Sequence, residues 1–548
     1  MSTTEYPEHT EGEGSSVKPR FSFISPIHNS ISVDSAYSVV PLIVILALLT
    51  ALGRAAEKPN LVIILADDMG YSDPGCYGGE IPTPALDRLA RDGVRLSRFH
   101  NGGMCVVSRA SLLTGKWWPR ALPEFARTPL LPEKLKQAGY RNALVGKWHL
   151  DGHPLDRGFD HFFGFLGGFA DHFSGGPGYQ LDRAPFKSFP PDYYSSDAFT
   201  ARAIDFVRTP GEQPFFLYLS YQAPHNPLQA PREDILKHRG RYAKGWQAVR
   251  EARFERQQKL GLIPTNAVLP AYPQNLPDWN TLSPAQRDLE DLRMAVYAAM
   301  VERMDRGIGR LLEALEQSGK LDNTFIFFLS DNGADSFSVV DQAMLAKDLL
   351  PGDRGSNWQP GSGWAYASNT PWRLHKISQH GGGITTGGIA FGPAVRKSNR
   401  IEAAPIHVVD VLPTLLEMTG TPATGDGESF LPLLRGEPWT RKGNLFFQYM
   451  DNRAIRTAGW TLAEVDGSGW ELFNTAADPL ETRNLAAEHS EKVADLEARW
   501  NRWWGKPYQP ESTKGSPHYQ PQGDRGTGTP YVPSAMPTKL SQRYPLQP

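Results

Sequence analysis

Polar residues follow four short apolar runs of the chain, at the point where each run ends. The runs cover 60–65, 140–145, 215–221 and 324–330. The residues behind them are acids, one amide, one lysine and two histidines: Asp67, Asp68, Lys147, His149, His225, Asp331 and Asn332. Such runs predict buried parallel strands, whose carboxyl ends meet at one edge of a sheet. We therefore expect these side chains to converge.

The oxygen-bearing side chains of this set suit a hard cation. Asp67, Asp68, Asp331 and Asn332 offer carboxylate and amide oxygens, which are the ligands that calcium and magnesium prefer. Carboxylates that converge without a cation repel one another and raise each other's pKa. The lysine and the two histidines are better suited to surround an anionic substrate and to supply protons.

A second chemical feature is Cys105, which stands where a glycine-containing loop opens a short predicted helix. Free backbone N–H groups and the helix dipole favour an anion at such a place, and Arg109 lies one turn further on. Two other interpretations stay open: a buried structural cysteine, and a disulfide with Cys76. A phosphatase thiolate loop is disfavoured because Arg109 is too close to Cys105.

The elements that must position these groups alternate between strand and helix. Residues 131–138 form an amphipathic helical pattern ended by Gly139, and 284–318 form a long one ended by Gly319. Alternating strands and helices predict an α/β fold with a mostly parallel central sheet and helices on both faces. A smaller C-terminal α+β subdomain is expected to follow.

Composition excludes several classes of protein. The 548 residues carry 57 Lys and Arg against 59 Asp and Glu, so a dedicated nucleic-acid binder, which should be basic, is not expected. Only two cysteines are present, which allows neither a disulfide framework nor a cysteine zinc site.

The two ends of the chain differ from its middle. Residues 39–52 are almost wholly apolar, and small residues follow, which is typical of a signal peptide. We therefore expect a protein exported to the periplasm or secreted; an uncleaved membrane anchor is the alternative. The tail is rich in Pro, Gly, Ser and Thr and should be extended or disordered. The expected parts are a leader (1–56), a catalytic domain (57–440), a C-terminal subdomain (441–505) and a tail (506–548).

Residues 105–115 carry the pattern Cys-x-x-Ser-Arg-x-x-x-Leu-Thr-Gly, which resembles the signature of the type I sulfatases in the alkaline phosphatase superfamily. Further motifs similar to those of the family extend the resemblance over 60–485. They are Asp67-Asp68-Met69-Gly70, Gly146-Lys147-Trp148-His149, Ser330-Asp331-Asn332-Gly333, the region from Gly363 to His380, and Asp478 to Leu485. The arginine-rich stretch 244–264 resembles an insertion of long bacterial arylsulfatases; a solvated helix is the alternative.

The resemblance implies a reaction and a site. Family members hydrolyse sulfate monoesters with a formylglycine, made from the signature cysteine by a formylglycine-generating enzyme or maturase. Its hydrate has two hydroxyls: one attacks sulfur, and the other is deprotonated to expel sulfate. The resemblance implies that calcium is bound by Asp67, Asp68, Asp331 and Asn332, joined by a hydroxyl of the residue made from Cys105. It implies that Arg109 and His149 hold and activate the hydrate. It also implies that Lys147, Lys376 and His225 bind the sulfate and the leaving oxygen.

The chain departs from the family pattern at two places. Val107 stands where the family usually has Pro or Ala, and His380 is followed by Gly381 where the family usually has Glu. The resemblance implies a sulfated small molecule or glycan as substrate. Two alternatives remain: a phosphomonoesterase or phosphodiesterase of the same superfamily, and a catalytically silent protein that binds sulfated glycans if Cys105 stays a thiol.

Overall fold

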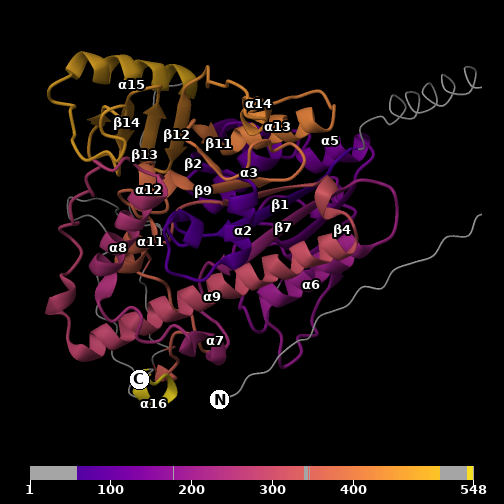
Figure 1. The fold of residues 1–548 in the computed structure, drawn as a ribbon, viewed down its shortest axis with the longest axis horizontal. Coiled ribbons are helices and arrows are strands. Elements are labelled where there is room, and N and C mark those ends of the chain that lie inside the picture. Colours follow the sequence, from indigo (N-terminus) through magenta and orange to yellow (C-terminus); the bar gives the residue numbers. More distant parts are fainter. Residues whose placement is uncertain (1–57, 177, 338–343, 345, 506–539, 547–548) are drawn as a thin grey trace, which may run out of the picture. The chain divides into compact units, whose positions relative to one another are not determined.

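The four apolar runs form neighbouring central strands of one large sheet in the computed structural model (Figure 1). β1 (Asn60–Asp67) pairs in parallel with β7 (Phe215–Pro224) on one side and with β8 (Thr324–Ser330) on the other. β3 (Arg141–Lys147) continues the sheet in parallel beyond β7. Because these strands run the same way, their carboxyl ends meet at one edge, as predicted.

The structure describes residues 58–505 and 540–546, except 177, 338–343 and 345. They belong to one unit that begins at Lys58. The proposed leader and signal peptide lie outside the described residues, as does most of the tail. Among the helices that can be described, none has the length and apolar character needed to cross a bilayer.

The sheet runs in the order β10-β2-β9-β8-β1-β7-β3-β4-β5-β6, with β11 paired to β2. β9 pairs antiparallel with β2 and β8, and β5 pairs antiparallel with β4 and β6. The remaining strands are β2 (Val94–His100), β4 (His161–Phe165), β5 (Tyr179–Leu181), β6 (Ala184–Pro185), β9 (Thr385–Phe391), β10 (Arg400–Glu402) and β11 (Ile406–His407).

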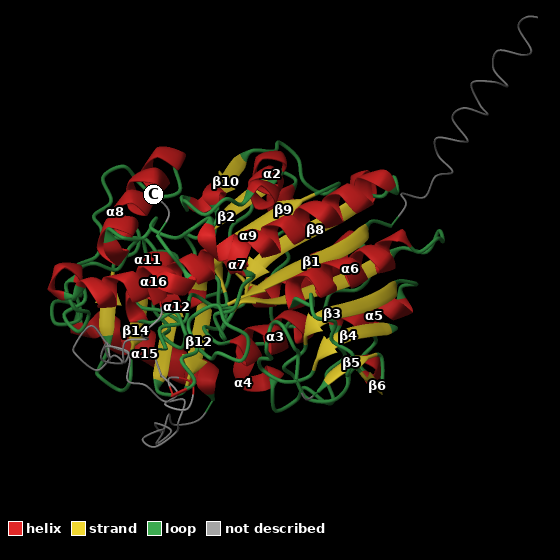
Figure 2. Cartoon of the chain, turned by 90° about the horizontal axis from the view of Figure 1, so that it is seen from below, coloured by secondary structure: helices red, strands yellow, loops and turns green. Residues whose placement is uncertain are grey.

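Helices cover both faces of the sheet (Figure 2), because the central strands carry apolar side chains on both of their faces. In β1, Val62 and Ile64 point into one apolar cluster, whereas Leu61 and Ile63 point into the other. The first cluster is covered by α2 (Pro84–Asp92), α6 (Ser195–Arg208), α8 (Gly245–Leu260) and α9 (Pro284–Gln317). The second is covered by α3 (Cys105–Thr114), α5 (Leu131–Gln137), α13 (Val411–Met418) and α14 (Leu431–Leu434). The predicted α/β architecture is confirmed.

A small antiparallel sheet lies beyond the large one in the sequence. Its strands pair in the order β12 (Leu445–Tyr449), β13 (Asn452–Arg456), β14 (Thr461–Glu464) and β15 (Glu471–Phe473). α15 (Ser490–Trp504) packs Leu496 and Trp500 onto one face of this sheet. Short helices complete the described chain: α4 (Trp118–Ala121), α7 (Arg232–Leu236), α11 (Ser362–Ser368), α12 (Gly381–Ile384) and α16 (Leu540–Arg543), with 3₁₀ turns at Gly75–Tyr77, Pro154–Asp156, Trp279–Thr281, Leu321–Asn323 and Val408–Asp410.

The stretch 244–264 does form a helix, α8, but the interpretation of a solvated helix is wrong. Arg250 and Arg253 are fully buried. Arg250 donates to the carbonyl oxygen of Tyr366 at 2.7 Å, and Arg253 forms an ion pair with Asp73 at 2.7 Å. Arginines indicate a solvated helix face only when the protein interior offers them no acceptor. Here the loop after β1 supplies Asp73, and α11, which follows in the chain, supplies the Tyr366 carbonyl.

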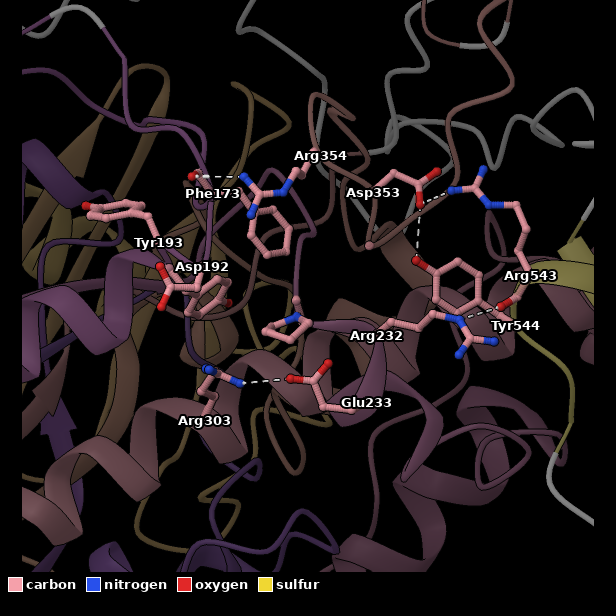
Figure 3. A pocket seen from close by; sticks show the side chains of 14 residues that line it. Phe173, Asp192, Tyr193, Arg232, Glu233, Arg303, Asp353, Arg354, Arg543 and Tyr544 are labelled. Atoms are coloured by element: carbon pink, nitrogen blue, oxygen red, sulfur yellow. Dashed lines mark hydrogen bonds and ion pairs between the residues drawn. The ribbon is translucent and has the colours of Figure 1, made fainter. Parts of the chain in front are cut away.

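The end of the tail is also not extended throughout. Leu540, the first residue of α16, and Tyr544, the residue after its end, are both buried. Arg239 donates to the Tyr544 carbonyl at 3.1 Å, and the Tyr544 hydroxyl donates to Asp353 at 3.1 Å. Figure 3 shows Tyr544 and Arg543 forming one side of a pocket of about 540 Å³. The polar composition of the tail gave no signal for these two apolar anchors.

Two buried histidines should make the fold sensitive to acid. Burial is the main cause that holds the pKa values of His100 and His407 well below the ordinary value, and both side chains are almost fully inaccessible. The folded protein therefore stays unprotonated at these rings while the unfolded chain takes up protons below pH about 6.5. Their contribution to stability is present above that pH and is lost as the pH falls.

We expect the free energy of unfolding to fall by on the order of 1 kcal/mol per pH unit for each of these rings below pH about 6.5. Denaturant unfolding at pH 7 and pH 5.5 would measure the loss. His407→Gln should show a smaller loss between the two pH values than the unsubstituted protein. Equal losses would contradict the assignment.

Candidate active site

The predicted carboxylates meet with buried cations at the edge where β1, β3 and β8 end. The Lys147 ammonium lies 2.6 Å from Asp67 Oδ2, and the Lys376 ammonium lies 2.7 Å from Asp68 Oδ1. All four side chains are buried. Lys376 was assigned to this group only through the resemblance, because along the chain it does not follow any of the four apolar runs.

Asp331 and Asn332 join the same cluster from the end of β8. The Arg109 guanidinium binds Asp331 Oδ2 through Nε at 3.0 Å and through Nη2 at 2.9 Å. Asn332 donates its amide N–H to Asp68 Oδ1 at 2.5 Å. Arg109 also donates to the Lys147 carbonyl at 3.1 Å, so that α3 is tied to both β3 and β8.

Cys105 is the first residue of α3 and is only 1% exposed. Ligand atoms of Asp67, Cys105 and Asp331 all lie within 4.8 Å of one another. A second overlapping group joins Asp67, Asp68 and His225 at the same spacing. Among the described residues both cysteines are free thiols, so the alternative of a Cys76–Cys105 bridge is not realised.

Some polar atoms of the cluster have no hydrogen-bond partner among the described residues. Within the described chain, Asp67 Oδ1 and Asn332 Oδ1 are buried without a hydrogen-bond donor. Burial, with repulsion from Asp67 as the next cause, raises the pKa of Asp331 to about 7. Buried oxygens without donors and a carboxyl that resists ionisation are the features that a bound cation relieves. The acidic cluster can therefore hold a metal ion.

Burial raises the pKa of the Cys105 thiol, although Lys147 and Lys376 oppose it. A thiol in this environment is mainly protonated and is a poor nucleophile as it stands. Burial would also raise the pKa of Asp68, but Lys376 and His225 outweigh it and hold the pKa of that carboxyl below its ordinary value.

The two histidines flank the cluster with different partners. His225 Nε2 lies 3.5 Å from Asp68 Oδ2, and its Nδ1 lies 2.6 Å from the Asn226 carbonyl oxygen, which fixes the ring. Burial lowers the pKa of His225 to about 3 and that of His149 to about 2, the latter helped by Lys147. His149 is therefore a neutral imidazole, and its buried Nδ1 has no partner among the described residues.

The backbone around the site is strained or tightly packed where it presents these side chains. Asp68 and His149 adopt left-handed φ values of 63° and 56°, which cost energy for residues other than glycine. At Gly146 an added Cβ would meet the Ser220 carbonyl oxygen at 1.8 Å. Only glycine allows β3 to approach β7 closely enough to place Lys147 where it lies.

The small C-terminal sheet supports the loop that carries Lys376. His380 Nε2 lies 2.8 Å from Glu471 Oε2, and the Gly381 N–H donates to Glu481 Oε2 at 3.2 Å. Glu481 also binds Arg456 of β13. The C-terminal sheet thus helps to position Lys376 within the buried cluster.

Sequence reasoning missed two residues beside the predicted set. The Ser220 hydroxyl accepts from Arg109 at 2.5 Å. Asp335 is buried with one oxygen unpartnered among the described residues, and burial, opposed by Lys376, raises its pKa to about 7. Asp335 follows Asn332 by three residues, and that proximity was the only available signal.

Comparisons with known proteins identify the family. The family model for sulfatases matches residues 59–421. An arylsulfatase of Klebsiella aerogenes is 36% identical over 66% of this chain and 87% of its own length. An uncharacterised sulfatase of Schizosaccharomyces pombe is 34% identical over 81% of this chain and 93% of its own length.

The fold agrees with this relationship. The crystal structure of Ps i-CgsB in complex with k-i-k-neocarrahexaose superposes with a TM-score of 0.62 at 25% identity, over 84% of this chain and 96% of the other. The fold and the buried cluster therefore define a hydrolase of the alkaline phosphatase superfamily. Within that superfamily the chain belongs to the sulfatase family. It is a sulfatase, an enzyme that hydrolyses sulfate esters.

Proposed function

We propose that the chain hydrolyses sulfate monoesters of arylsulfatase type with a formylglycine made from Cys105 and one bound calcium ion. The convergence of Cys105 with buried carboxylates and cations at one strand edge is the observation that carries this proposal. Conversion of Cys105 requires a formylglycine-generating enzyme or maturase as a partner. We also propose export after cleavage of the leader within 1–56, with anchoring by residues 39–52 as the alternative.

The donor set supports calcium over zinc. Asp67, Asp68, Asp331 and Asn332 would hold the ion together with the residue made from Cys105, and magnesium is the other cation such oxygens suit. A bound cation neutralises the carboxylates and draws charge from the sulfuryl oxygens. Asp67 Oδ1 and Asn332 Oδ1, which lack donors within the described residues, are free to face it.

The remaining residues handle the nucleophile and the sulfate. Formylglycine supplies a hydrated aldehyde whose hydroxyl attacks sulfur. Arg109, held by Asp331, would orient that hydrate, and the neutral His149 ring would help to hold and activate it. The Lys147 and Lys376 ammoniums would bind the sulfate oxygens and stabilise the charge that develops on them.

The substrate proposed is a sulfated small molecule or glycan. The Klebsiella relative is an arylsulfatase, and the human relative that is 28% identical over 80% of this chain is an N-acetylgalactosamine-6-sulfatase. Turnover of an aryl sulfate against the matched aryl phosphate, with and without a chelator, tests the proposal. We expect turnover of the sulfate that is lost on chelation and restored by calcium. If the protein preferred the phosphate and active protein contained two zinc ions, the phosphatase alternative would replace the sulfatase proposal.

His225 gives a prediction that depends on the leaving group. Its Nδ1 donates to a carbonyl, so Nε2 faces the cluster; once Nε2 is protonated, a state that the neighbouring Asp68 carboxylate favours, it would give that proton to the leaving oxygen. His225→Ala should lower turnover of alkyl sulfates by roughly 10²–10⁴-fold but of nitrophenyl sulfates far less, because an acidic phenol leaves without a proton. Rates over a series of leaving groups would measure the difference. Equal losses across the series would remove the acid role from His225.

A further inference from the structure

An exposed aromatic ring stands beside the catalytic histidine. Phe169 is 59% exposed and is the one aromatic side chain so exposed within the part of the chain that the structure describes. Its ring lies nearly parallel to that of His225, with an interplanar angle of 15° and centroids 6.3 Å apart. An exposed phenylalanine lacks the stabilisation that burial of its ring would give. Its position next to the proposed reacting groups therefore suggests that a bound ligand covers it.

The segment that carries Phe169 is fixed to the end of β7 and to the loop after it, which carries His225. The carbonyl oxygen of Ala170 accepts from Gln222 of β7 at 2.5 Å. Asp171 Oδ2 accepts from Gln229 at 2.6 Å. The exposed ring therefore keeps its place relative to His225, because its segment is tied to β7 on one side of His225 and to the following loop on the other.

The two residues before Phe169 are glycines, which leave space next to the backbone. An added Cβ at Gly167 would meet no atom within 4 Å, whereas one at Gly168 would lie 3.0 Å from His149 Nε2. Glycine at 168 thus keeps the space next to the His149 ring clear. Phe169 is the first residue with a side chain after these two glycines.

We propose that Phe169 is a specificity-determining residue that stacks on a ring in the leaving group of the sulfate ester. This proposal rests on the proposed function, in which His225 meets the leaving oxygen. A ring in a leaving group that begins at His225 would lie close to the neighbouring Phe169 face. The ligand chemistry is a six-membered ring with a flat apolar face, supplied either by an aryl group or by a pyranose. Such stacking stabilises binding through face contact.

Three sulfate esters distinguish the sources of that ring: 4-nitrophenyl sulfate, a methyl pyranoside 6-sulfate, and acyclic hexyl sulfate. Phe169→Ala should raise KM for the ring-bearing substrate about tenfold, while kcat changes much less. The rise for hexyl sulfate should be at least threefold smaller. An effect on the nitrophenyl ester alone assigns an aryl partner, and one on the pyranoside assigns a sugar.

Matched variants separate stacking from a merely structural role. Phe169→Trp should restore the KM of the unsubstituted protein, whereas Phe169→Leu, which is apolar but not flat, should not. Val268→Ala removes another exposed apolar side chain, from a distant part of the sequence, and should leave all three substrates unaffected. Equal changes for ring-bearing and acyclic esters in Phe169→Ala, or no change for any, would overturn the proposal.

Binding measured without turnover keeps the two proposals apart. In a Cys105→Ala background, the dissociation constants of the same three esters can be compared with and without Phe169→Ala. Weaker binding of a ring-bearing ester alone supports stacking on Phe169, whether or not the unsubstituted protein turns over any of the three esters. A lack of turnover would count only against the proposed reaction. Turnover by the unsubstituted protein with identical binding changes for all three esters would instead reject Phe169 alone.

Discussion

Replacing Cys105 with alanine is expected to abolish hydrolysis of sulfate esters, with a loss of at least about 10³-fold in kcat. Cys105 begins α3 within reach of Asp67 and Asp331, so the substitution would remove the proposed attacking group and one proposed metal ligand together. Initial rates with an aryl sulfate at saturating concentration would measure the loss. The folded structure should persist, because alanine suits this buried helix start.

Cys76 supplies the matched control for this experiment. It is equally a buried free cysteine, but its backbone N–H binds Asp87 instead of a group of the catalytic cluster. Cys76→Ala should therefore keep most of the activity. The mass of the peptide containing Cys105, together with trapping by an aldehyde reagent, would report its conversion. An unmodified thiol in protein without sulfatase turnover would favour the silent glycan-binding alternative instead.

Substituting Asp331 should remove both metal and activity. Asp331→Asn keeps the shape and one acceptor oxygen for Arg109, but it removes the charge that would hold the cation. We expect metal content per chain to fall and kcat to drop by on the order of 10³-fold. Elemental analysis of purified protein and initial rates would check both.

The control for Asp331 is a buried aspartate paired with arginine outside the site. Asp410 binds Arg441 and accepts from the His407 N–H at 2.7 Å. Asp410→Asn should lower the melting temperature, since it weakens a buried ion pair, while metal content and kcat per folded molecule stay unchanged. A metal content that Asp331→Asn leaves intact would contradict the proposed ligand set.

The central strands and the cluster at their ends followed from local patterns. The apolar runs that became β1 and β8 end directly at Asp67 and Asp331, so their positions along the chain predicted their meeting in space. The sheet edge needs only parallel order to bring such residues together. This part of the site is therefore encoded in short segments of sequence.

Other features depend on contacts between distant segments and left little trace in any one of them. From the sequence alone, Arg253 is interpreted as a solvated charge. Only the fold shows that the loop carrying Asp73 packs against it and supplies its ion-pair partner. Tyr544 stands in a polar tail, and only its contact with Asp353 shows that it is an anchor. Phe169 is an ordinary apolar residue in the sequence, and its exposure beside His225 is visible only in the fold.

The depth at which Cys105 lies sets an order of events in the making of this enzyme. With 1% of its surface exposed, the side chain is out of reach of any second protein once α3 has packed against β3 and β8. If Cys105 is converted to formylglycine as proposed, the modifying enzyme must therefore act on the nascent or unfolded chain. Protein produced in a host without that activity would fold around the thiol and stay inactive, and later addition of the maturase would not rescue it unless the chain were first unfolded.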